Sequence, residues 1–454
     1  MSSILSCPPR DARHHWPGRG GGQVASRCAP LDESGWCSVG TRWARRFVVG
    51  GIAVVALVGA CTSSPPVPPN EASTSRAVTS GAGYADQLRS TLAGLLDSMK
   101  VPSAVVVVRS PTFGDATLSF GTVKLGENTA PNVSDHYRIG SNTKPMTATV
   151  VLQLVQEGRL TLEDPISRYR PDVPNGQNIT IGQLLNMRSG LASYTEDPVF
   201  LRTIDQDKQR GWQPEELLKL AYTQPALFAP GASWHYSNTN YILLGLVMEQ
   251  LTGKTVSQLF QERLFSPLGM RSSVMPAVAD ASIPEPYAHG YHFGTAEETG
   301  GPSAALPPAQ QQSATAGTLQ PQDWTGNNPS WGWTAGSAIS TADDLAVFVG
   351  ALVDGGLLDA SMQQRRLASV EPPDPANPSF GYGYGLMRFG TYYGHNGQLP
   401  GYNSWMVRDP KTGTTLIILT SLTSSPDGKT PADVLGLATL EVLAKQAAPT
   451  QTST

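Results

Sequence analysis

Apolar positions recur along the chain with two different periods, and the change of period marks the first helices and strands. Residues 87–99 carry leucines three and four positions apart, which predicts an amphipathic helix. Residues 103–109 are a β-branched run typical of a buried strand, and residues 117–122 predict a second one. Residues 141–157 have the spacing of a long helix that ends at a glycine.

The middle of the chain is predicted to be mainly helical. Apolar residues recur there at helical spacing, at Leu184, Leu185, Leu217, Leu218, Leu243, Leu244, Val247 and Leu251. Residues 284–329 are rich in Pro, Gln and Gly and have little periodicity, which predicts a long surface excursion.

The end of the chain returns to strands. After a helix at residues 341–353, the pattern predicts antiparallel strands and a closing helix, at residues 388–393, 404–408, 414–420 and 431–446. Strands near both chain ends with helices between them predict an α+β fold. We expect one antiparallel sheet built from the two chain ends and flanked by helices, with a mainly helical lobe inserted at about residues 140–335.

Composition and charge exclude several classes of function. The 454 residues have a net charge of -4, and the body of the chain has no basic block, so no nucleic-acid partner is expected. All cysteines lie within the first 61 residues, at Cys7, Cys28, Cys37 and Cys61. The body therefore has no thiolate nucleophile and no cysteine-based zinc site. Glycine-rich segments lack the spacing of nucleotide-binding loops, and we expect neither metal nor cofactor.

An export signal is predicted at the start of the chain. Residues 47–60 are an uncharged, mostly apolar run behind Arg42, Arg45 and Arg46, and this run is shorter than the roughly 20 residues of a spanning helix. It ends in small residues before Cys61, which resembles a bacterial lipobox, where the cysteine becomes the lipidated N-terminus. The alternative is a buried core strand with a chance cysteine.

This interpretation places the protein in the cell envelope, anchored by lipid to the outer side of the cytoplasmic membrane. The segment that follows the cysteine is rich in Ser, Pro and Thr and is expected to act as a tether. The predicted division of the chain is an export signal at 1–60, lipidated Cys61 and tether at 61–84, one enzyme domain at 85–446, and a disordered tail at 447–454.

The first candidate for chemistry is Ser141-Asn142-Thr143-Lys144 at the start of a predicted helix. Residues i and i+3 share a helix face, so the Lys144 amine can reach the Ser141 hydroxyl. A desolvated lysine with a lowered pKa can accept the proton of a serine nucleophile. Taken alone, the pattern also fits a capping serine beside a solvated lysine.

Two further short motifs accompany this one. Tyr236-Ser237-Asn238 precedes a helix expected to open at Asn240, where a phenol and an amide could reach a cleft; the alternative is a helix cap and a packed aromatic residue.

His395-Asn396-Gly397 ends a strand-like run, and its glycine allows close approach of a substrate. A lone histidine there would more often be a surface residue. A chance occurrence of all three motifs in this order is improbable.

The order Ser-x-x-Lys, Tyr-x-Asn, His-x-Gly resembles the penicillin-recognising serine hydrolases. These include class C β-lactamases, secreted actinobacterial D-alanyl-D-alanine carboxypeptidases and related esterases, and the resemblance extends over about residues 85–445. It implies that Ser141 is the acylated nucleophile and that Lys144 accepts its proton. Tyr236 would pass the proton to the leaving group, and Asn238 would bind the substrate amide carbonyl.

The resemblance also implies an oxyanion hole formed by the backbone N–H groups of Ser141 and Gln398. Trp331 and Arg388 match positions that line the cleft, with Arg388 as a partner for a terminal carboxylate; the alternatives are a core tryptophan and a solvated arginine.

His395 takes the place where the family has Lys or His, ahead of the small residue and Gly397. Asn396 is a departure, because the family usually has Thr or Ser there, whose hydroxyl helps to hold the substrate carboxylate. An amide can still donate a hydrogen bond.

The implied function is a lipid-anchored serine hydrolase that works through a covalent acyl-enzyme. A D-alanyl-D-alanine carboxypeptidase acting on peptidoglycan stem peptides is the leading expectation, with the membrane and the peptide substrate as its partners. An esterase acting on short acyl groups and a weak β-lactamase remain alternatives. A lipoprotein that binds cell-wall fragments or penicillin without turnover is the non-enzymatic alternative.

Overall fold

The computed structural model describes residues 82–299 and 305–447. The predicted export signal at 1–60, the predicted lipidation site Cys61 and the part of the predicted tether up to residue 81 lie outside the described residues, as does the predicted tail from residue 448 onward.

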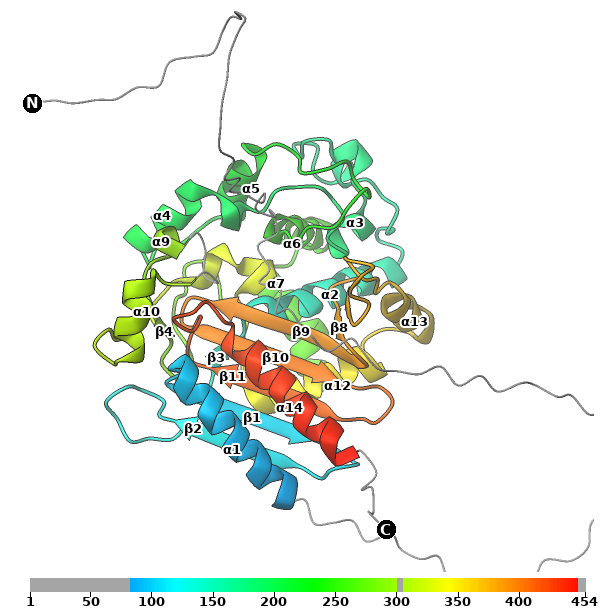
Figure 1. Ribbon diagram of the computed structural model, residues 1–454. Helices are drawn as coiled ribbons and strands as arrows, with labels where there is room; N and C mark the ends of the chain where they lie inside the picture. The colour runs from blue at the N-terminus through cyan, green and yellow to red at the C-terminus, as the bar shows by residue number, and fades with distance from the viewer. Residues whose placement is uncertain (1–81, 300–304, 448–454) are drawn as a thin grey trace, which may run out of the picture. The chain divides into compact units, whose positions relative to one another are not determined.

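A seven-stranded antiparallel sheet forms the centre of the described chain (Figure 1). Its strands, in spatial order, are β2 (Ala116–Gly121), β1 (Ser103–Arg109), β11 (Thr415–Thr420), β10 (Tyr402–Arg408), β9 (Tyr392–Leu399), β8 (Met387–Phe389) and β7 (Phe380–Tyr382). Strand β1 pairs with β11 so that Val106 lies opposite Ile418. The prediction of a sheet built from both chain ends is therefore confirmed.

The single strand predicted at residues 388–393 is wrong. The segment holds the end of β8, a turn and the start of β9, and Arg388 lies opposite Tyr393. Gly390 has a φ of +61°, a left-handed conformation that lets the chain reverse there.

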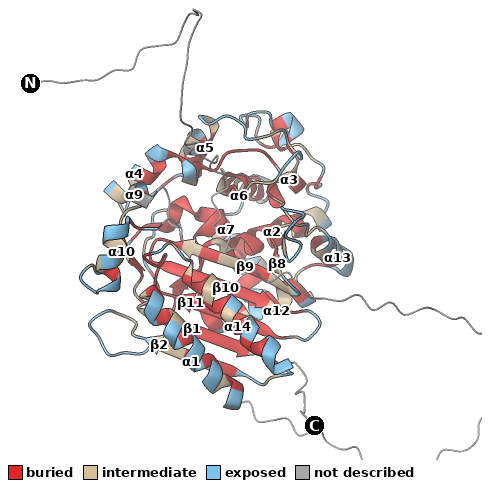
Figure 2. Ribbon diagram, viewed as in Figure 1, coloured by how far each residue is buried: buried red, intermediate tan, exposed pale blue. Residues whose placement is uncertain are grey.

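Helices α1 (Ala82–Met99) and α14 (Pro431–Ala447) cover one face of the sheet and lie side by side (Figure 1). Their buried side chains pack with Val106, Trp405 and Ile418, while their outer surfaces are exposed (Figure 2). Contact with α14 is so close that a Cβ on Gly436 would come within 2.0 Å of the Trp405 ring.

The opposite face carries the larger core. Val105 and Val107 point into it, whereas Val106 and Val108 point toward α1 and α14, as the two-residue alternation of a strand requires. The helices that contact this face are α2 (Thr143–Gln156), α11 (Trp333–Gly336) and α12 (Ala342–Asp354), and α6 (Asn238–Thr252) packs against α2 and α11.

Shorter elements complete this layer. The predicted leucine-rich helices correspond to α3 (Ile181–Leu185), α5 (Pro214–Tyr222) and α6, so the mainly helical middle is confirmed. The other helices are α4 (Pro198–Gln206), α7 (Val256–Phe260), α8 (Ser266–Leu268), α9 (Ala296–Thr299), α10 (Pro308–Thr315) and α13 (Ala360–Ala368). Small strand pairs are β3 (Tyr137–Arg138) with β6 (Ile339–Ser340), and β4 (Tyr291–His292) with β5 (Gln322–Asp323).

Residues 284–329 are not the surface excursion that their composition predicts. Tyr291, Phe293, Leu306 and Trp324 are buried, and the first three form a small core with Leu422. Isolated apolar residues in irregular backbone anchor this segment, and such residues leave no periodic signal in the sequence.

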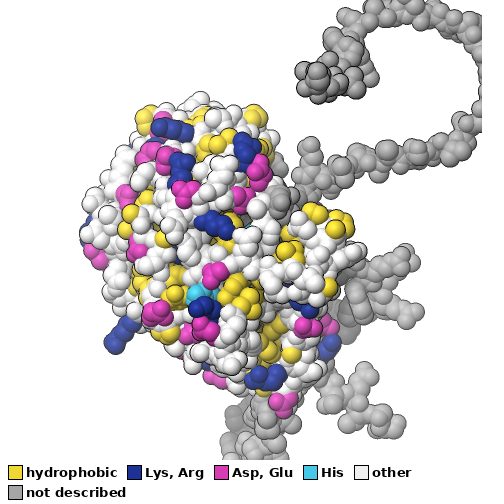
Figure 3. Space-filling view, turned by 90° about the vertical axis from the view of Figure 1, so that its left-hand side faces the viewer, with side chains coloured by type: hydrophobic (Ala, Val, Ile, Leu, Met, Phe, Trp, Pro, Cys, Tyr) yellow, Lys and Arg dark blue, Asp and Glu magenta, His cyan; other side chains and the backbone are white. Residues whose placement is uncertain are grey.

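None of the described helices combines the length and hydropathy that crossing a membrane would require. On the face shown in Figure 3, Lys and Arg side chains are interspersed with Asp and Glu side chains.

Candidate active site

Ser141 lies in a single 3-10 turn, η1 (Gly140–Asn142), that leads into α2. Two glycines let this turn pack directly against β9. Gly140 has a φ of +54°, and a Cβ on it would lie 2.5 Å from the backbone nitrogen of Gln398. A Cβ on Gly397 would lie 2.0 Å from the carbonyl oxygen of Ile139. The nucleophile candidate is therefore fixed beside the edge of the sheet.

The Lys144 amine is fully buried and reaches three oxygen atoms. Its Nζ lies 2.9 Å from Ser141 Oγ, 2.7 Å from Asn238 Oδ1 and 2.7 Å from the backbone oxygen of Ala335. Within the described residues, no carboxylate forms an ion pair with it. Burial lowers the pKa of Lys144 well below its ordinary value.

A neutral Lys144 amine can form a hydrogen bond with each of these three oxygen atoms. The amide oxygen of Asn238 and the carbonyl of Ala335 can only accept, so they take the two N–H hydrogens of neutral Lys144. The nitrogen lone pair is then left for the hydroxyl hydrogen of Ser141. This is the arrangement that a general base needs before a serine attacks.

Tyr236 lies over the same amine, with its ring centroid 4.8 Å from Lys144 Nζ. Burial raises the pKa of the Tyr236 phenol, and a hydrogen bond with the Ser141 side chain opposes that rise. Tyr382 packs edge-on against the ring, at 6.0 Å between centroids. Tyr236 is thus a neutral phenol in contact with the nucleophile, able to hand on a proton.

His395 is buried in β9 and is neutral. Burial, followed by the repulsion that Lys144 exerts when it is protonated, lowers the pKa of His395 to about 3, although a hydrogen bond between its Nδ1 and the Asn396 backbone carbonyl partly opposes this. Its Nε2 lies 3.4 Å from the Tyr382 hydroxyl, and its ring is 6.3 Å from that of Tyr236.

Asn238 is the first residue of α6, so this helix opens two residues before the predicted Asn240. Its amide is held at both ends: Oδ1 accepts from Lys144, and Nδ2 donates to Thr195 Oγ1 at 3.1 Å. The Asn238 backbone N–H donates to Ser193 Oγ at 3.2 Å. This fixed amide orients the lysine.

The side chains of β9 alternate between the two faces of the sheet. Asn396 and Gln398 point away from α2, and Asn396 Nδ2 lies 3.0 Å from each carboxylate oxygen of Asp433 in α14. Gln398 Nε2 donates to the carbonyl of Thr423 at 2.8 Å. The donors of Asn396 are therefore engaged by an acid.

Trp331 and Arg388 lie apart from this group. Trp331 is buried against Phe200, and its carbonyl accepts from the Tyr194 hydroxyl. Arg388 donates to the carbonyl of Pro378 at 2.8 Å. Among the described residues, neither of these two side chains forms a hydrogen bond with Ser141 or Lys144.

Several residues of the site are missing from the sequence prediction. Tyr382 follows a glycine in the run Gly381–Gly385, which was a usable signal. Thr195 and Ser193 lie in no motif, and the Ala335 group is a backbone carbonyl that any residue would supply. None of these three groups could therefore be identified before the fold was known. Among the described residues, no three His, Cys, Asp or Glu side chains are grouped as metal ligands would be.

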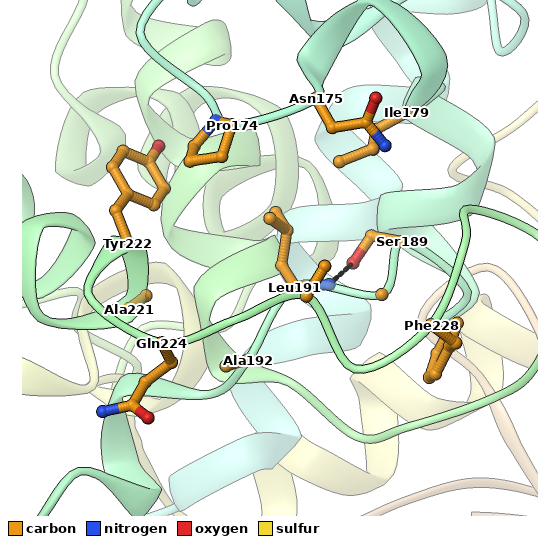
Figure 4. A pocket seen from close by; sticks show the side chains of 12 residues that line it. Pro174, Asn175, Ile179, Ser189, Leu191, Ala192, Ala221, Tyr222, Gln224 and Phe228 are labelled. Carbon is orange, nitrogen blue, oxygen red and sulfur yellow. Dashed lines mark hydrogen bonds between the residues drawn. The ribbon is translucent and has the colours of Figure 1, made fainter.

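A small cavity of about 50 Å³ lies behind the segment that leads to Ser193 (Figure 4). Leu191, Tyr222 and Phe228 line it, and Ser189 Oγ accepts from the Leu191 N–H and donates to Asn240. No residue of the catalytic group lines this cavity.

Comparison with known proteins agrees with this geometry. The Beta-lactamase family model matches residues 88–440. The putative penicillin-binding protein PbpX of Bacillus subtilis is 27% identical over 285 residues, which cover 63% of this chain and 61% of that protein. Esterase EstB of Burkholderia gladioli is 29% identical over 329 residues, covering 63% and 77%. The chain spans less than two thirds of the length of the Bacillus subtilis relatives that it matches.

Solved structures are also similar to this chain, and the similarity covers more of it. A D-stereospecific amidohydrolase from Streptomyces sp. is 29% identical with a TM-score of 0.65, covering 79% of this chain and 99% of that one. D-amino acid amidase from Ochrobactrum anthropi, in complex with L-phenylalanine amide, is 25% identical with a TM-score of 0.66, covering 80% and 100%. The chain therefore belongs to the Beta-lactamase family.

Proposed function

We propose that this protein hydrolyses amide or ester bonds of D-aminoacyl compounds through a covalent acyl-enzyme on Ser141. The observation that carries the proposal is the position of Lys144 Nζ, which lies within hydrogen-bond distance of Ser141 Oγ and of two oxygens that can only accept, Asn238 Oδ1 and the Ala335 carbonyl oxygen.

The reaction follows from these contacts. Ser141 Oγ attacks the substrate carbonyl carbon, and its proton passes to Lys144. The tetrahedral intermediate collapses, the carbon–nitrogen or carbon–oxygen bond breaks, and the leaving group takes a proton through Tyr236. Water then attacks the ester on Ser141, gives its proton to the same pair of groups, and releases the acid. The backbone N–H groups of Ser141 and Gln398 are the proposed donors to the oxyanion.

The D-aminoacyl specificity is supported by the relatives. Two structural neighbours that align over nearly their whole length are named for action on D-configured substrates. The D-alanyl-D-alanine-carboxypeptidase/endopeptidase AmpH of Escherichia coli is 32% identical over 166 residues, which cover 34% of this chain. A carboxypeptidase on peptidoglycan stem peptides and an amidase on neutral D-aminoacyl amides both fall within the proposal.

An esterase acting on short acyl groups is the second candidate. It is favoured by esterase EstB, because 77% of that protein's length aligns with this chain. Turnover of p-nitrophenyl acetate together with no preference between D- and L-phenylalaninamide would select it. A slow penicilloyl adduct in the intact mass would instead indicate the β-lactamase alternative.

The test uses the parent protein, Ser141→Ala and the exposed-serine control Ser134→Ala. We expect the parent and the control to hydrolyse D-phenylalaninamide at least about tenfold faster than the L-enantiomer, since each 1.4 kcal/mol of discrimination is a factor of ten. Ser141→Ala should lose this activity and any acyl adduct. Hydrolysis by Ser141→Ala at the parent's rate would overturn the proposal, and the absence of hydrolysis in both proteins would favour a binding lipoprotein without turnover.

We further propose that the protein is exported and anchored by lipid at Cys61. Support comes from the apolar run at residues 47–60, its basic flank and the small residues before the cysteine. Expressed with its leader in a bacterium, the parent should enter the detergent phase of a Triton X-114 partition, and Cys61→Ser should remain in the aqueous phase. An unchanged distribution of Cys61→Ser would exclude this anchor.

A further inference from the structure

Two hydroxyl groups lie at the end of the Asn238 amide that is turned away from Lys144. Thr195 belongs to the 3-10 turn η4 (Tyr194–Glu196), and its Oγ1 accepts from Asn238 Nδ2 at 3.1 Å. Ser193 is buried just before this turn, and its Oγ accepts from the Asn238 backbone N–H at 3.2 Å. The two hydroxyl oxygens are 2.8 Å apart. The mechanism proposed above uses neither hydroxyl.

The contacts of Asn238 fix the direction of these hydrogen bonds. Both N–H groups of Asn238 can only donate, so each takes a lone pair from one hydroxyl oxygen. Thr195 then gives its own hydrogen to Ser193 Oγ, which has a second lone pair to accept it. In this chain of hydrogen bonds, Thr195 presents a lone pair and not a hydrogen to the Asn238 amide.

The orientation of the Asn238 amide decides what the Lys144 amine can do. The amide oxygen lies 2.7 Å from Lys144 Nζ and accepts one of its hydrogens, as the Ala335 carbonyl also does. An amide turned end for end would place its NH₂ group against Lys144, and that group would donate to the nitrogen lone pair. Lys144 could then no longer accept the proton of Ser141. The Ala335 carbonyl belongs to the backbone and cannot turn in this way.

The titratable side chains that face Lys144 give the amine no charged partner. The rings of Tyr236 and Tyr241 have their centroids 4.8 and 5.5 Å from its Nζ. Burial raises the pKa of both phenols and lowers the pKa of His395 to about 3, so all three groups are neutral near neutral pH. A change in the Asn238 amide is therefore not masked by a neighbouring ion.

We infer that Thr195 is a positioning residue, whose lone pair holds the Asn238 amide with its oxygen toward Lys144 and so keeps the Lys144 lone pair available to Ser141. This inference rests on the proposed acyl-enzyme function and adds a residue to its machinery. Thr195 acts through Asn238 and is not a catalytic residue.

The test compares Thr195→Val with Thr195→Ser. Valine has nearly the shape of threonine but neither accepts nor donates, so the amide is free to turn, whereas serine keeps the hydroxyl. We expect kcat/KM for D-phenylalaninamide and for p-nitrophenyl acetate to fall about tenfold or more in Thr195→Val, and to stay within about threefold of the parent in Thr195→Ser. The matched control is Thr203→Val, because Thr203 is also half-buried and its hydroxyl binds only the Val199 carbonyl, at 2.7 Å. This control should match the parent.

A second measurement separates orientation from simple loss of packing. An amide oxygen beside Lys144 stabilises the protonated amine, and an NH₂ group in its place disfavours it. The pKa of Lys144 should therefore fall further in Thr195→Val, so that the acid limb of the kcat/KM profile for p-nitrophenyl acetate moves to lower pH. Carbon-13 NMR of lysine-labelled protein measures the same pKa without substrate, and Lys144→Arg assigns the resonance. Ser193→Ala, which leaves the Thr195 hydrogen free for the amide oxygen, should shift this pKa in the same direction.

These measurements can also overturn the inference. It is wrong if Thr195→Ser is as impaired as Thr195→Val, or if Thr195→Val keeps the parent activity. A Thr195→Val variant with a lower melting temperature or a lower activity, but with an unmoved acid limb and an unmoved Lys144 resonance, would show that Thr195 only stabilises η4. If Thr195→Val does not fold, the Lys144 pKa in Ser193→Ala decides. Failure of the proposed function is distinct, because it appears as hydrolysis that survives Ser141→Ala.

Discussion

Burial lowers the pKa of the Lys144 amine well below its ordinary value and so favours the neutral form that a general base requires. Since its pKa is lowered, the active neutral form is gained as pH rises through a value well below 10.5 and is lost on acidification. We expect kcat/KM for a neutral D-aminoacyl amide to increase with pH as the neutral form of Lys144 increases. Lys144→Arg keeps a cation that cannot deprotonate, so activity should fall about a thousandfold. The exposed control Lys254→Arg should have the same pH dependence of kcat/KM as the parent. If Lys144→Arg also had the parent's activity and pH dependence, Lys144 would not be the general base.

Tyr236 should matter more for amides than for activated esters. Tyr236→Phe keeps the ring over Lys144 and against Tyr382 but removes the phenol that hands a proton to the leaving group. An amine must be protonated as it leaves, whereas p-nitrophenolate leaves as an anion. We therefore expect amide hydrolysis to fall by about a hundredfold or more and p-nitrophenyl acetate hydrolysis by much less. Tyr222→Phe, whose hydroxyl has no described partner, is the matched control.

The reacting residues were easier to predict from the sequence than the residues that position them. Ser141 and Lys144 were predictable because helix geometry alone brings positions i and i+3 together. Tyr236 required the family resemblance, since nothing local places it beside Ser141. Thr195, which holds the Asn238 amide, could not have been found, because a threonine in a loop has no distinctive pattern. The hydrogen bond from Asn396 to Asp433 joins residues 37 positions apart, and no local pattern predicts it.

At the scale of elements, the junction between η1 and β9 fixes the nucleophile. Gly140→Ala would add both a strained left-handed conformation and a collision with the Gln398 backbone. Gly158, beyond the other end of α2, has a φ of +68° with open space around it, so Gly158→Ala adds the strain alone. We expect Gly158→Ala to cost about 1 kcal/mol of unfolding free energy and Gly140→Ala at least about 1 kcal/mol more. Chemical denaturation measures both.

The two glycine variants should also differ in activity. Gly140→Ala must displace Ser141 from Gln398, so its kcat/KM should fall sharply even where the protein is fully folded, while Gly158→Ala should retain the parent value. Comparable activity of the two folded variants would show that the close approach of η1 to β9 is not needed for catalysis.

Elements were predictable where one period continued over many residues. Strand β1 matches its predicted bounds, and the closing helix α14 differs by one residue at its end. Prediction failed at residues 388–393, because a tight turn at Gly390 splits a run that reads as one strand. It failed again near Trp324, where burial depends on contacts with Lys208 and His292 from elsewhere in the chain.

At the scale of the whole molecule, stability is coupled to pH through buried histidines. Burial lowers the pKa of His292 to about 4 and that of His395 to about 3. Between these values and about 6.5, the unfolded chain binds protons that the folded chain does not. The free energy of unfolding therefore rises with pH in this window, and the protein loses stability as pH falls, by up to about 1.4 kcal/mol per pH unit for each histidine.

His292 allows this coupling to be tested away from the catalytic group. Its ring packs edge-on against Trp324 at 5.2 Å, and neither ring nitrogen has a described partner, so His292→Phe keeps the aromatic contact and removes the titration. In urea denaturation between about pH 7 and 5, the variant should lose stability less steeply than the parent, by about 1 kcal/mol per pH unit. Parallel pH dependences would show that His292 is protonated equally in the folded and unfolded chains, and the coupling would then have to come from His395 and the carboxylates.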